Sequence, residues 1–202
     1  MPQPIREHAP AAHVAHVMTT IGLLIASVRP NRVGEHVAQW VRDALRAKDP
    51  QGDVQIDLID LREVDLPYFD GLTSPKADGT KTTEHARAWG ERITGLDALI
   101  IVTPEYNGSY PGALKNAVDY LYDEWSALPI LAVGYGWGAG AGALELLERL
   151  MTRVGADVMG TVGLAFPTDL SLEGEIHPGE EPVSQLDAGL ETVLAKMSTT
   201  VA

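Results

Sequence analysis

Two patterns of hydrophobic residues alternate along this chain. Short, continuous apolar runs, which are typical of strands buried on both faces of a sheet, predict strands over residues 20–26, 54–61, 98–103, 129–135 and 157–164. Longer segments with apolar residues at every third or fourth position predict amphipathic helices over residues 33–47, 84–96, 112–122, 141–154 and 184–197. This alternation predicts an α/β fold, in which a doubly wound, five-stranded parallel sheet has right-handed crossovers and helices on both faces.

The remaining segments divide the chain into a tail and one domain. Residues 1–17 are rich in alanine, histidine and proline and predict a flexible N-terminal tail, whereas residues 18–202 have the length of a single domain. Residues 67–83 contain closely spaced turn-forming residues and predict a long loop. The acidic, turn-prone segment 167–182 is longer than the fold requires and predicts a mobile flap.

Composition argues against several classes of function. The formal net charge of −13 disfavours nucleic acid and anionic membrane surfaces as partners, because both attract basic proteins. The chain has no cysteine, so any redox activity requires a bound organic cofactor. No metal site is expected, because His8, His13 and His16 lie in the predicted flexible tail. The longest apolar stretch, residues 128–144, is broken by five glycines and a proline. No membrane helix is therefore expected, and without a targeting segment the expected location is cytoplasmic.

The most specific polar segment follows the third predicted strand. Residues 103–112 read Thr-Pro-Glu-Tyr-Asn-Gly-Ser-Tyr-Pro-Gly and precede a predicted helix. The prolines stiffen this loop, while Gly108 and Gly112 allow positive φ or close approach of the backbone to a ligand. Ligands of open α/β sheets bind at this carboxyl edge, so the loop suits a flat heterocycle rich in hydrogen-bonding atoms. The alternative is a helix-entry turn with Ser109 as the cap and Pro111 at the first helical position.

The loop after the first predicted strand has the composition of an anion site. Ser27, Arg29 and Arg32 lie just before a predicted helix, whose free backbone N–H groups favour negative charge. A hydroxyl and two forked guanidinium groups would complement a phosphate. The alternative is that both arginines are solvated and pair with Glu35 or Asp43. This is not a Walker A loop, because no Gly-Lys-Ser/Thr follows.

A third, glycine-rich loop follows the fourth predicted strand. Residues 134–139 fit the pattern Gly-x-Gly-x-x-Ala, but a dinucleotide fingerprint belongs after the first strand, so close backbone approach to one edge of a flat ligand is favoured. In the flavodoxin-like strand order 2-1-3-4-5, the first, third and fourth strands are adjacent and their loops converge on one rim. A phosphate at the first loop and a flat ring between the other two describe a mononucleotide, and FMN fits this description.

These segments resemble the NADPH-dependent FMN reductase family of flavodoxin-like proteins, which includes flavin, quinone, azo-dye and chromate reductases. The resemblance rests on residues 27–34, Ser-Val-Arg-Pro-Asn-Arg-Val-Gly, and on residues 103–119, and it spans roughly residues 20–165. It implies an oxidoreductase that passes hydride from NADPH or NADH through FMN to a small acceptor, with no side-chain acid or base required. It also implies a homodimer or homotetramer with flavin sites near subunit contacts.

The resemblance further implies roles for individual positions. The FMN phosphate would be held by Ser27, Arg29 and Arg32, together with the backbone of Val33 and Gly34. The isoalloxazine and ribityl chain would be bordered, largely through backbone, by Pro104, Glu105, Tyr106 and Asn107. The pyrimidine end of the ring would be approached by Gly134, Tyr135 and Gly136. Tyr106 and Asn107 would position the flavin, and Glu105 would organise the backbone or a subunit contact.

Two positions depart from the family pattern. Ala26 stands where a glycine usually precedes the phosphate-loop serine, and Trp137 stands where small or polar residues are more usual. The indole either shapes the substrate face or packs in an interface. Two other functions stay open at this point: a flavodoxin-type electron carrier, which would favour a hydroxyl-rich phosphate loop, and a non-redox flavodoxin-like binding protein. The sequence specifies neither the electron acceptor nor a preference for NADPH over NADH.

Overall fold

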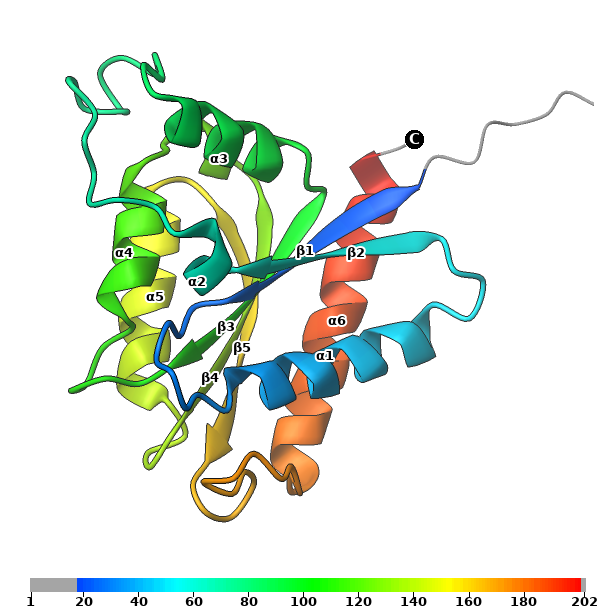
Figure 1. The fold of residues 1–202 in the computed structure, drawn as a ribbon. Helices are drawn as coiled ribbons and strands as arrows, with labels where there is room; N and C mark the ends of the chain where they lie inside the picture. The colour runs from blue at the N-terminus through cyan, green and yellow to red at the C-terminus, as the bar shows by residue number, and fades with distance from the viewer. Residues whose placement is uncertain (1–17, 201–202) are drawn as a thin grey trace, which may run out of the picture.

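The computed structural model describes residues 18–200 and shows strands and helices in alternation (Figure 1). The strands are β1 (Thr19–Ile25), β2 (Val54–Asp60), β3 (Ala98–Pro104), β4 (Pro129–Gly136) and β5 (Asp157–Ala165). The helices are α1 (Gly34–Lys48), α2 (Leu61–Val64), α3 (Glu84–Thr94), α4 (Gly112–Asp119), α5 (Ala141–Arg153) and α6 (Glu180–Thr200), with a 3-10 turn, η1 (Asp123–Trp125). The predicted tail, residues 1–17, lies outside the described residues.

The five strands form one parallel sheet in the order β2-β1-β3-β4-β5, which confirms the predicted topology. The chain changes its winding direction between β1 and β3, and parallel α/β sheets bind ligands at such a point. The register places Pro104 of β3 opposite Tyr135 of β4. The loops that follow these two strands therefore start side by side.

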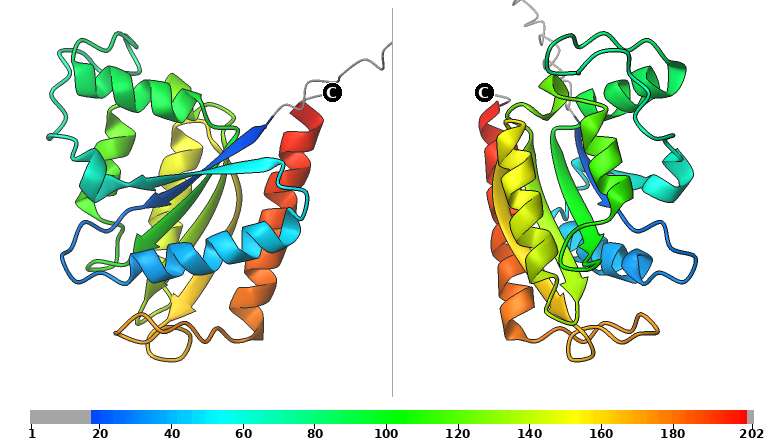
Figure 2. Two further views of the ribbon diagram at one scale, coloured as in Figure 1. Left: turned by 45° about the vertical axis from the view of Figure 1, so that its right-hand side comes forward. Right: turned by 90° about the vertical axis from the view of Figure 1, so that its left-hand side faces the viewer.

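Helices cover both faces of the sheet. α1 and α6 pack on one face, and α3, α4 and α5 pack on the other (Figures 1 and 2). Side chains on a strand alternate between the faces, so Leu23 and Ile25 of β1 join the core under α1 and α6, while Leu24 joins the core on the opposite side. Every residue of β3 is buried, as expected for a central strand covered on both sides.

Some boundaries differ from the sequence predictions for local reasons. α2 and η1 were not predicted because both are too short to show a helical period. α6 begins at Glu180 and not at residue 184, so the end of the predicted flap is helical. Pro182 does not prevent this, because a proline in the first turn of a helix removes an N–H that has no partner within the helix.

The segment between β5 and α6 is fastened at both ends. The buried Asp169 carboxylate accepts hydrogen bonds from the backbone N–H groups of Ala165, at 2.9 Å, and Gly179, at 3.0 Å. Leu172, between these anchor points, has an exposed side chain. The mobility of this segment stays a prediction.

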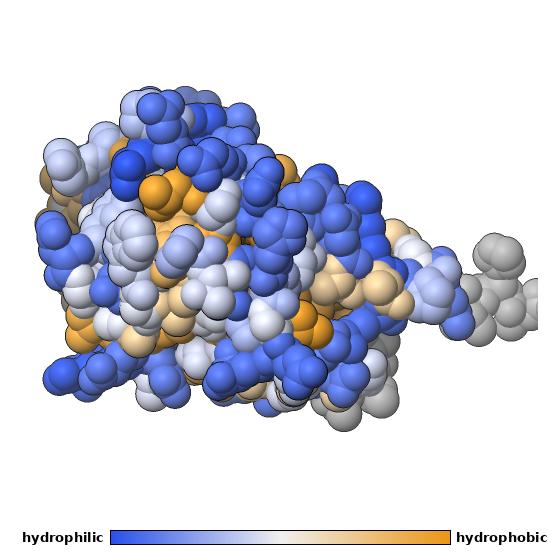
Figure 3. All heavy atoms as spheres, turned by 90° about the horizontal axis from the view of Figure 1, so that it is seen from below, coloured by the Kyte–Doolittle hydropathy of each residue, from blue (hydrophilic) through white to orange (hydrophobic). Residues whose placement is uncertain are grey.

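The face seen in Figure 3 is mostly hydrophilic, with apolar side chains in small groups between the polar ones. Two groups of exposed apolar residues are relevant below: Tyr68 and Leu72 on the loop before α3, and Trp137 and Leu172 at the carboxyl end of the sheet. Within residues 18–200, no helix combines the length and the apolar character needed to cross a bilayer.

Candidate active site

The loops after β1, β3 and β4 meet around a cavity of about 450 Å³, which is in the usual size range for cofactor sites. All of the site positions predicted from the sequence line it except Gly34 and Gly134. Five further residues line the cavity: the sequence singled out Gly108 and Trp137 without assigning them to the cofactor site, and it assigned no role to Asn31, Phe166 and Leu172. The last two come from the end of the sheet at β5, which was not expected to contribute.

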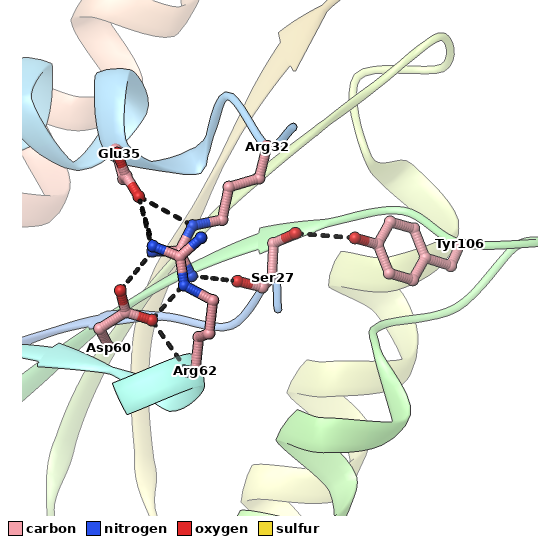
Figure 4. A network of polar contacts seen from close by, with 6 residues as sticks. All are labelled: Ser27, Arg32, Glu35, Asp60, Arg62 and Tyr106. Carbon is pink, nitrogen blue, oxygen red and sulfur yellow. Dashed lines mark hydrogen bonds and ion pairs between the residues drawn. The ribbon is translucent and has the colours of Figure 1, made fainter. Parts of the chain in front are cut away.

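Arg32 lies under the first loop and not at its surface (Figure 4). Its side chain is only 2% exposed, and it forms a bidentate ion pair with Asp60 at the end of β2. The Glu35 carboxylate accepts from Nε at 3.0 Å and from Nη2 at 2.6 Å. Nη1 also donates to the backbone carbonyl of Ser27 at 2.6 Å. These contacts use all five N–H donors of the guanidinium group.

The Asp60 carboxylate is fixed by the same network. Its burial alone would raise its pKa, but hydrogen bonds from Arg32 and from the backbone N–H of Arg62 outweigh this effect and hold the pKa below the ordinary value. Asp60 also caps α2 through its bond to the Arg62 N–H, at 2.9 Å. Arg32 therefore ties the first loop to the end of β2, and it has no donor left for a ligand in this arrangement.

Arg29 is placed very differently. Its side chain lies on the exposed part of the loop, where the guanidinium carbon sits 5.8 Å from the centre of the Tyr106 ring in a cation–π contact. Within residues 18–200, no hydrogen bond or ion pair occupies its guanidinium group. Of the two arginines predicted to contact phosphate, only Arg29 has its donors available at the cavity.

The N-terminus of α1 lies at the cavity together with Arg29, where the N-cap residue Val33 is one of the lining residues. Val33 occupies the N-cap position and offers no side-chain hydrogen bond to the first-turn N–H groups, so the partial positive charge of the helix end is not offset by a capping oxygen. A Cβ on Gly34 would lie 2.9 Å from the Tyr135 hydroxyl oxygen and 3.2 Å from Ile25. Glycine is therefore needed here so that the helix end can pack closely on β1 and β4.

Hydroxyl groups connect the loop after β1 to the loop after β3. Ser27 Oγ and Tyr106 Oη lie 2.7 Å apart in a hydrogen bond that spans the cavity between β1 and β3. The side chain of Tyr135 is buried beneath this pair, and burial raises its pKa well above the ordinary tyrosine value. Tyr135 was predicted to approach a flavin ring, whereas its side chain points to the phosphate end and packs against Gly34.

The loop after β3 is a tight hairpin. Tyr106 and Ser109 exchange backbone hydrogen bonds of 2.7 and 3.1 Å around Asn107 and Gly108, whose φ angles are 52° and 77°. Positive φ at both central residues defines a type I′ turn, for which Asn-Gly is the strongest sequence signal. The predicted positive φ is thus confirmed at Gly108. The helix-entry alternative was wrong in detail, because Pro111 is the N-cap residue and α4 begins at Gly112.

Glu105 joins this hairpin to the loop after β4. Its carboxylate accepts hydrogen bonds from the first-turn N–H groups of α5, at 2.8 Å from Gly142 and 3.4 Å from Ala143. A carboxylate at a helix N-terminus satisfies unpaired donors and interacts favourably with the helix dipole. Glu105 therefore organises backbone, as the sequence predicted, and the helix it organises is α5.

Replacing Glu105 with alanine is expected to lower the free energy of unfolding by about 0.5–2 kcal/mol, because two helix N–H groups lose their acceptor. Glu105→Gln should lower the free energy of unfolding less, since its amide oxygen can still accept a hydrogen bond. Urea unfolding measures the stability of both variants. Glu145→Ala, at an exposed position on α5, is the control. An alanine variant as stable as the control would contradict the capping role.

Gly134 and Gly136, near the end of β4, have different roles. A Cβ on Gly134 would lie 2.6 Å from the Leu144 side chain, so this glycine admits α5 to the sheet and does not face the cavity. Gly136 lines the cavity, where a Cβ would lie 3.3 Å from the Cβ of Glu105. Trp137 follows it with a side chain that is 71% exposed. The predicted backbone approach to a flat ligand is therefore available at Gly136.

The cavity thus has the three regions that FMN requires. A guanidinium with available donors and an open helix N-terminus suit a phosphate. The backbone of the hairpin suits the polar ribityl chain and one ring edge, and Gly136, which has no side chain, allows close backbone approach to a flat ring. A parallel sheet of this order, with these loops at its switch point, defines a flavodoxin-like mononucleotide-binding protein.

Comparison with known proteins identifies the family. The family described as NADPH-dependent FMN reductase matches residues 19–170, and the chain belongs to this family. It is therefore an FMN-dependent oxidoreductase that uses NAD(P)H.

Individual relatives agree with this result. The chain is 37% identical over 160 residues to the NAD(P)H-dependent FMN reductase ntnL of a Nectria species, covering 76% of this chain and 79% of the relative. It is 31% identical over 188 residues to the NAD(P)H-dependent FMN reductase LOT6 of Saccharomyces cerevisiae, covering 90% and 96%. A solved structure of FerB, a flavoenzyme from Paracoccus denitrificans, shares the fold with a TM-score of 0.60 at 24% identity, over 90% of this chain and 98% of that chain.

Proposed function

We propose that the enzyme binds FMN with the phosphate between Arg29, the Ser27 hydroxyl and the backbone N–H groups of Val33 and Gly34. The observation that carries this proposal is the available guanidinium of Arg29 beside the open N-terminus of α1. Both groups favour a dianion, and they lie at the same end of the cavity.

Arg32 has a different role from the one expected of it. Because its donors are used by Asp60, Glu35 and the Ser27 carbonyl, it positions the phosphate loop and does not contact the phosphate. Its charge still contributes to the potential at the site, although the two carboxylates largely balance it. Arg32 is therefore a positioning residue in this proposal.

The ring would lie between the hairpin after β3 and the loop after β4. Pro104, Glu105, Tyr106 and Asn107 would border it and the ribityl chain through their backbone, with Gly136 at the pyrimidine end. Bound FMN supplies hydride transfer between a nicotinamide and an acceptor, and this needs no acid or base from the protein. The residues that line the cavity would orient the ring and fix the polar atoms around its edge.

The absorbance spectrum of the purified protein tests the proposal. We expect a flavin spectrum that bleaches anaerobically when NADPH or NADH is added and returns when a flavin, quinone or azo acceptor follows. An azo acceptor is included because a relative from Staphylococcus haemolyticus, 29% identical over 170 residues, is named an azoreductase. A flavin that binds but bleaches only with dithionite would indicate an electron carrier, and failure to bind FMN would indicate a non-redox role.

We also propose that the enzyme is a homodimer or homotetramer. A second cavity of about 550 Å³ lies beside the phosphate loop, between the loop before α3 and the start of α4. Val28 of the phosphate loop and Tyr68 line it, and Tyr68 is 92% and Leu72 86% exposed. Exposed apolar groups of this kind favour association.

Replacing Tyr68 and Leu72 together with serine is therefore expected to shift the protein to the monomer, measured by light scattering at several concentrations. Leu146→Ser, an exposed apolar residue on α5, is the control. If the Tyr68/Leu72 double variant keeps the wild-type mass, as the control should, this surface is not the interface.

We place the enzyme in the cytoplasm, where NAD(P)H is available, and cell fractionation tests this location.

A further inference from the structure

The segment between β5 and α6 contains a buried carboxylate that the proposed FMN site does not use. Asp169 is 8% exposed, and its two carboxylate oxygens bind the backbone N–H groups of Ala165 and Gly179. Its backbone N–H donates to the Ala165 carbonyl at 2.8 Å, and its carbonyl accepts from the His177 N–H at 2.8 Å. Burying a carboxylate is costly unless hydrogen bonds compensate. These bonds close residues 169–179, called the strap below, into a loop at its base.

The strap is bonded internally and attached to the core. Leu170 is fully buried in the core under α1 and α6, and it forms an antiparallel bridge with Ile176. The Ser171 N–H donates to the Glu175 carbonyl at 2.8 Å. The Ser171 hydroxyl accepts from the N–H groups of Glu173 and Glu175, at 3.2 and 3.1 Å. The strap therefore has a defined shape, and its base is fixed to the core.

The tip of the strap reaches the start of α1 (Figures 1 and 2, in orange). Gly174 has a φ of 95°, and a Cβ at this position would lie 2.5 Å from Cδ2 and 2.7 Å from Cγ of His36, in the first turn of α1. Glycine is needed here both for the positive φ and for this close approach. The strap thus runs from the end of β5 to the helix whose N-terminus forms the phosphate end of the proposed FMN site.

One side chain of the strap faces the cavity. Leu172 lines it together with Phe166 and Trp137, and it is 57% exposed. Its position between the fixed base and the tip at Gly174 places an apolar group where a bound cofactor would cover it. A ligand that contacts the strap in this position stabilises the position, and the strap retains the ligand by the same free energy.

We infer that the strap forms one wall around bound FMN and retains the cofactor, and that Asp169 is the positioning residue that holds the strap in place. This inference rests on the proposed FMN site, because the strap acts on the ligand of that cavity. Within residues 18–200 the cavity lining includes Leu172 but not Asp169, so Asp169 acts through the strap. Loss of such a wall is expected to affect mainly the rate at which bound FMN leaves.

Asp169→Asn tests the inference, because it keeps the shape of the side chain but replaces one acceptor oxygen with an NH₂ group that faces a backbone N–H. We expect the FMN dissociation rate constant to rise about tenfold, while the association rate constant changes less than threefold. Leu172→Ala keeps both anchors and should raise the dissociation rate constant several-fold. Glu173→Gln removes the same charge from an exposed position on the strap and should behave as wild type. Stopped-flow flavin fluorescence measures both rate constants.

Hydrogen exchange adds a measurement that a purely structural role of Asp169 would not change. In the wild type, FMN should slow the exchange of the strap amides of Ser171, Gly174 and His177, which are hydrogen-bonded in the closed strap. The amide of Leu96, just before β3 and so at the opposite edge of the sheet, should gain less protection. Asp169→Asn should reduce the extra protection of the strap.

An FMN dissociation rate constant that is unchanged in both Asp169→Asn and Leu172→Ala would overturn the inference. So would strap amides that FMN protects no more than Leu96. If Asp169→Asn does not fold, Leu172→Ala and the wild-type exchange data decide, because Leu172 is exposed and its truncation leaves the anchors intact. These results differ from a failure of the proposed function, in which the wild type itself binds no FMN. That outcome would refute the cofactor site and the role of the strap with it.

Discussion

Replacing Arg32 with alanine is expected to lower the free energy of unfolding at neutral pH by about 3–5 kcal/mol. The Arg32 and Asp60 side chains are 2% and 9% exposed, so the variant leaves a buried carboxylate without its partner. The Ser27 carbonyl also loses a donor, and the phosphate loop loses its tie to β2. FMN affinity should fall as well, although Arg32 makes no phosphate contact in the proposed site.

The effect of Arg32→Ala should depend on pH in a defined direction. In the wild type, the network holds the pKa of Asp60 below its ordinary value. The ion pair therefore contributes stability above the ordinary carboxyl pKa of about 3.9, and this contribution is lost as the pH falls through the lowered pKa of the folded state. Without Arg32, burial dominates and raises the pKa of Asp60, so the variant loses less on acidification. The difference in the free energy of unfolding between the two proteins should be largest near pH 7. It should shrink as the pH falls through the raised pKa of Asp60 in the variant, which lies above about 3.9, and onward through the lowered pKa in the wild type.

Thermal and urea unfolding between these pH values provide the measurement. Arg62→Ala is the matched control, because its side chain belongs to the same network but is 44% exposed and contacts Glu35 only at 3.4 Å. Such an exposed pair is worth about 0–1 kcal/mol. Arg32→Lys keeps the charge but loses the bidentate geometry, and it should recover only part of the stability. A loss that stayed constant over this pH range would contradict the assignment to the Asp60 pair.

Replacing Arg29 with alanine is expected to weaken FMN binding by about 1.5–3 kcal/mol, or roughly 10–150-fold in Kd, because a charge-assisted contact to the phosphate is lost. The stability of the apoprotein should hardly change, since Arg29 is exposed and, among residues 18–200, its guanidinium has the Tyr106 ring contact but no hydrogen bond or ion pair. Added salt should reduce the difference, because charges near the surface are screened.

Riboflavin makes this test specific, because it has the same ring and ribityl chain but no phosphate. Arg29→Ala should weaken FMN binding and leave riboflavin binding close to wild type, as measured by flavin fluorescence. Arg46→Ala, in the last turn of α1, changes the same net charge at the far end of the helix and should affect neither ligand. Equal losses for both flavins would place Arg29 near the ring and not near the phosphate.

The two arginines show what the sequence could not decide. Arg29 and Arg32 lie three positions apart in one loop before a helix, and composition gave them the same role. Their difference depends on Asp60, which is distant in sequence and reaches Arg32 only because β2 pairs with β1 in register. An acidic residue at a strand end is too common to predict this pairing.

The contribution of β5 and the segment after it to the cavity was hidden for the same reason. Trp137 could be singled out as an unusual residue, but Phe166 and Leu172 gave no sequence signal. They reach the cavity because β5 pairs with β4 in parallel, so that its carboxyl end opens on the same rim. The Asn-Gly pair after β3, by contrast, carried enough local information to specify its turn, since few other residues adopt two successive positive φ angles.

The sequence by itself determined the five strands, the five longer helices and the loops that line the cavity, which follow from local periodicity and turn chemistry. The strand order was taken from the flavodoxin-like fold, one of the few topologies that parallel sheets allow. Only the tertiary structure decided which side chains in those loops have available donors and which are used by buried partners. Ion pairing, burial and ring contacts depend on segments that are far apart in the chain, and their positions are fixed only when the sheet has formed.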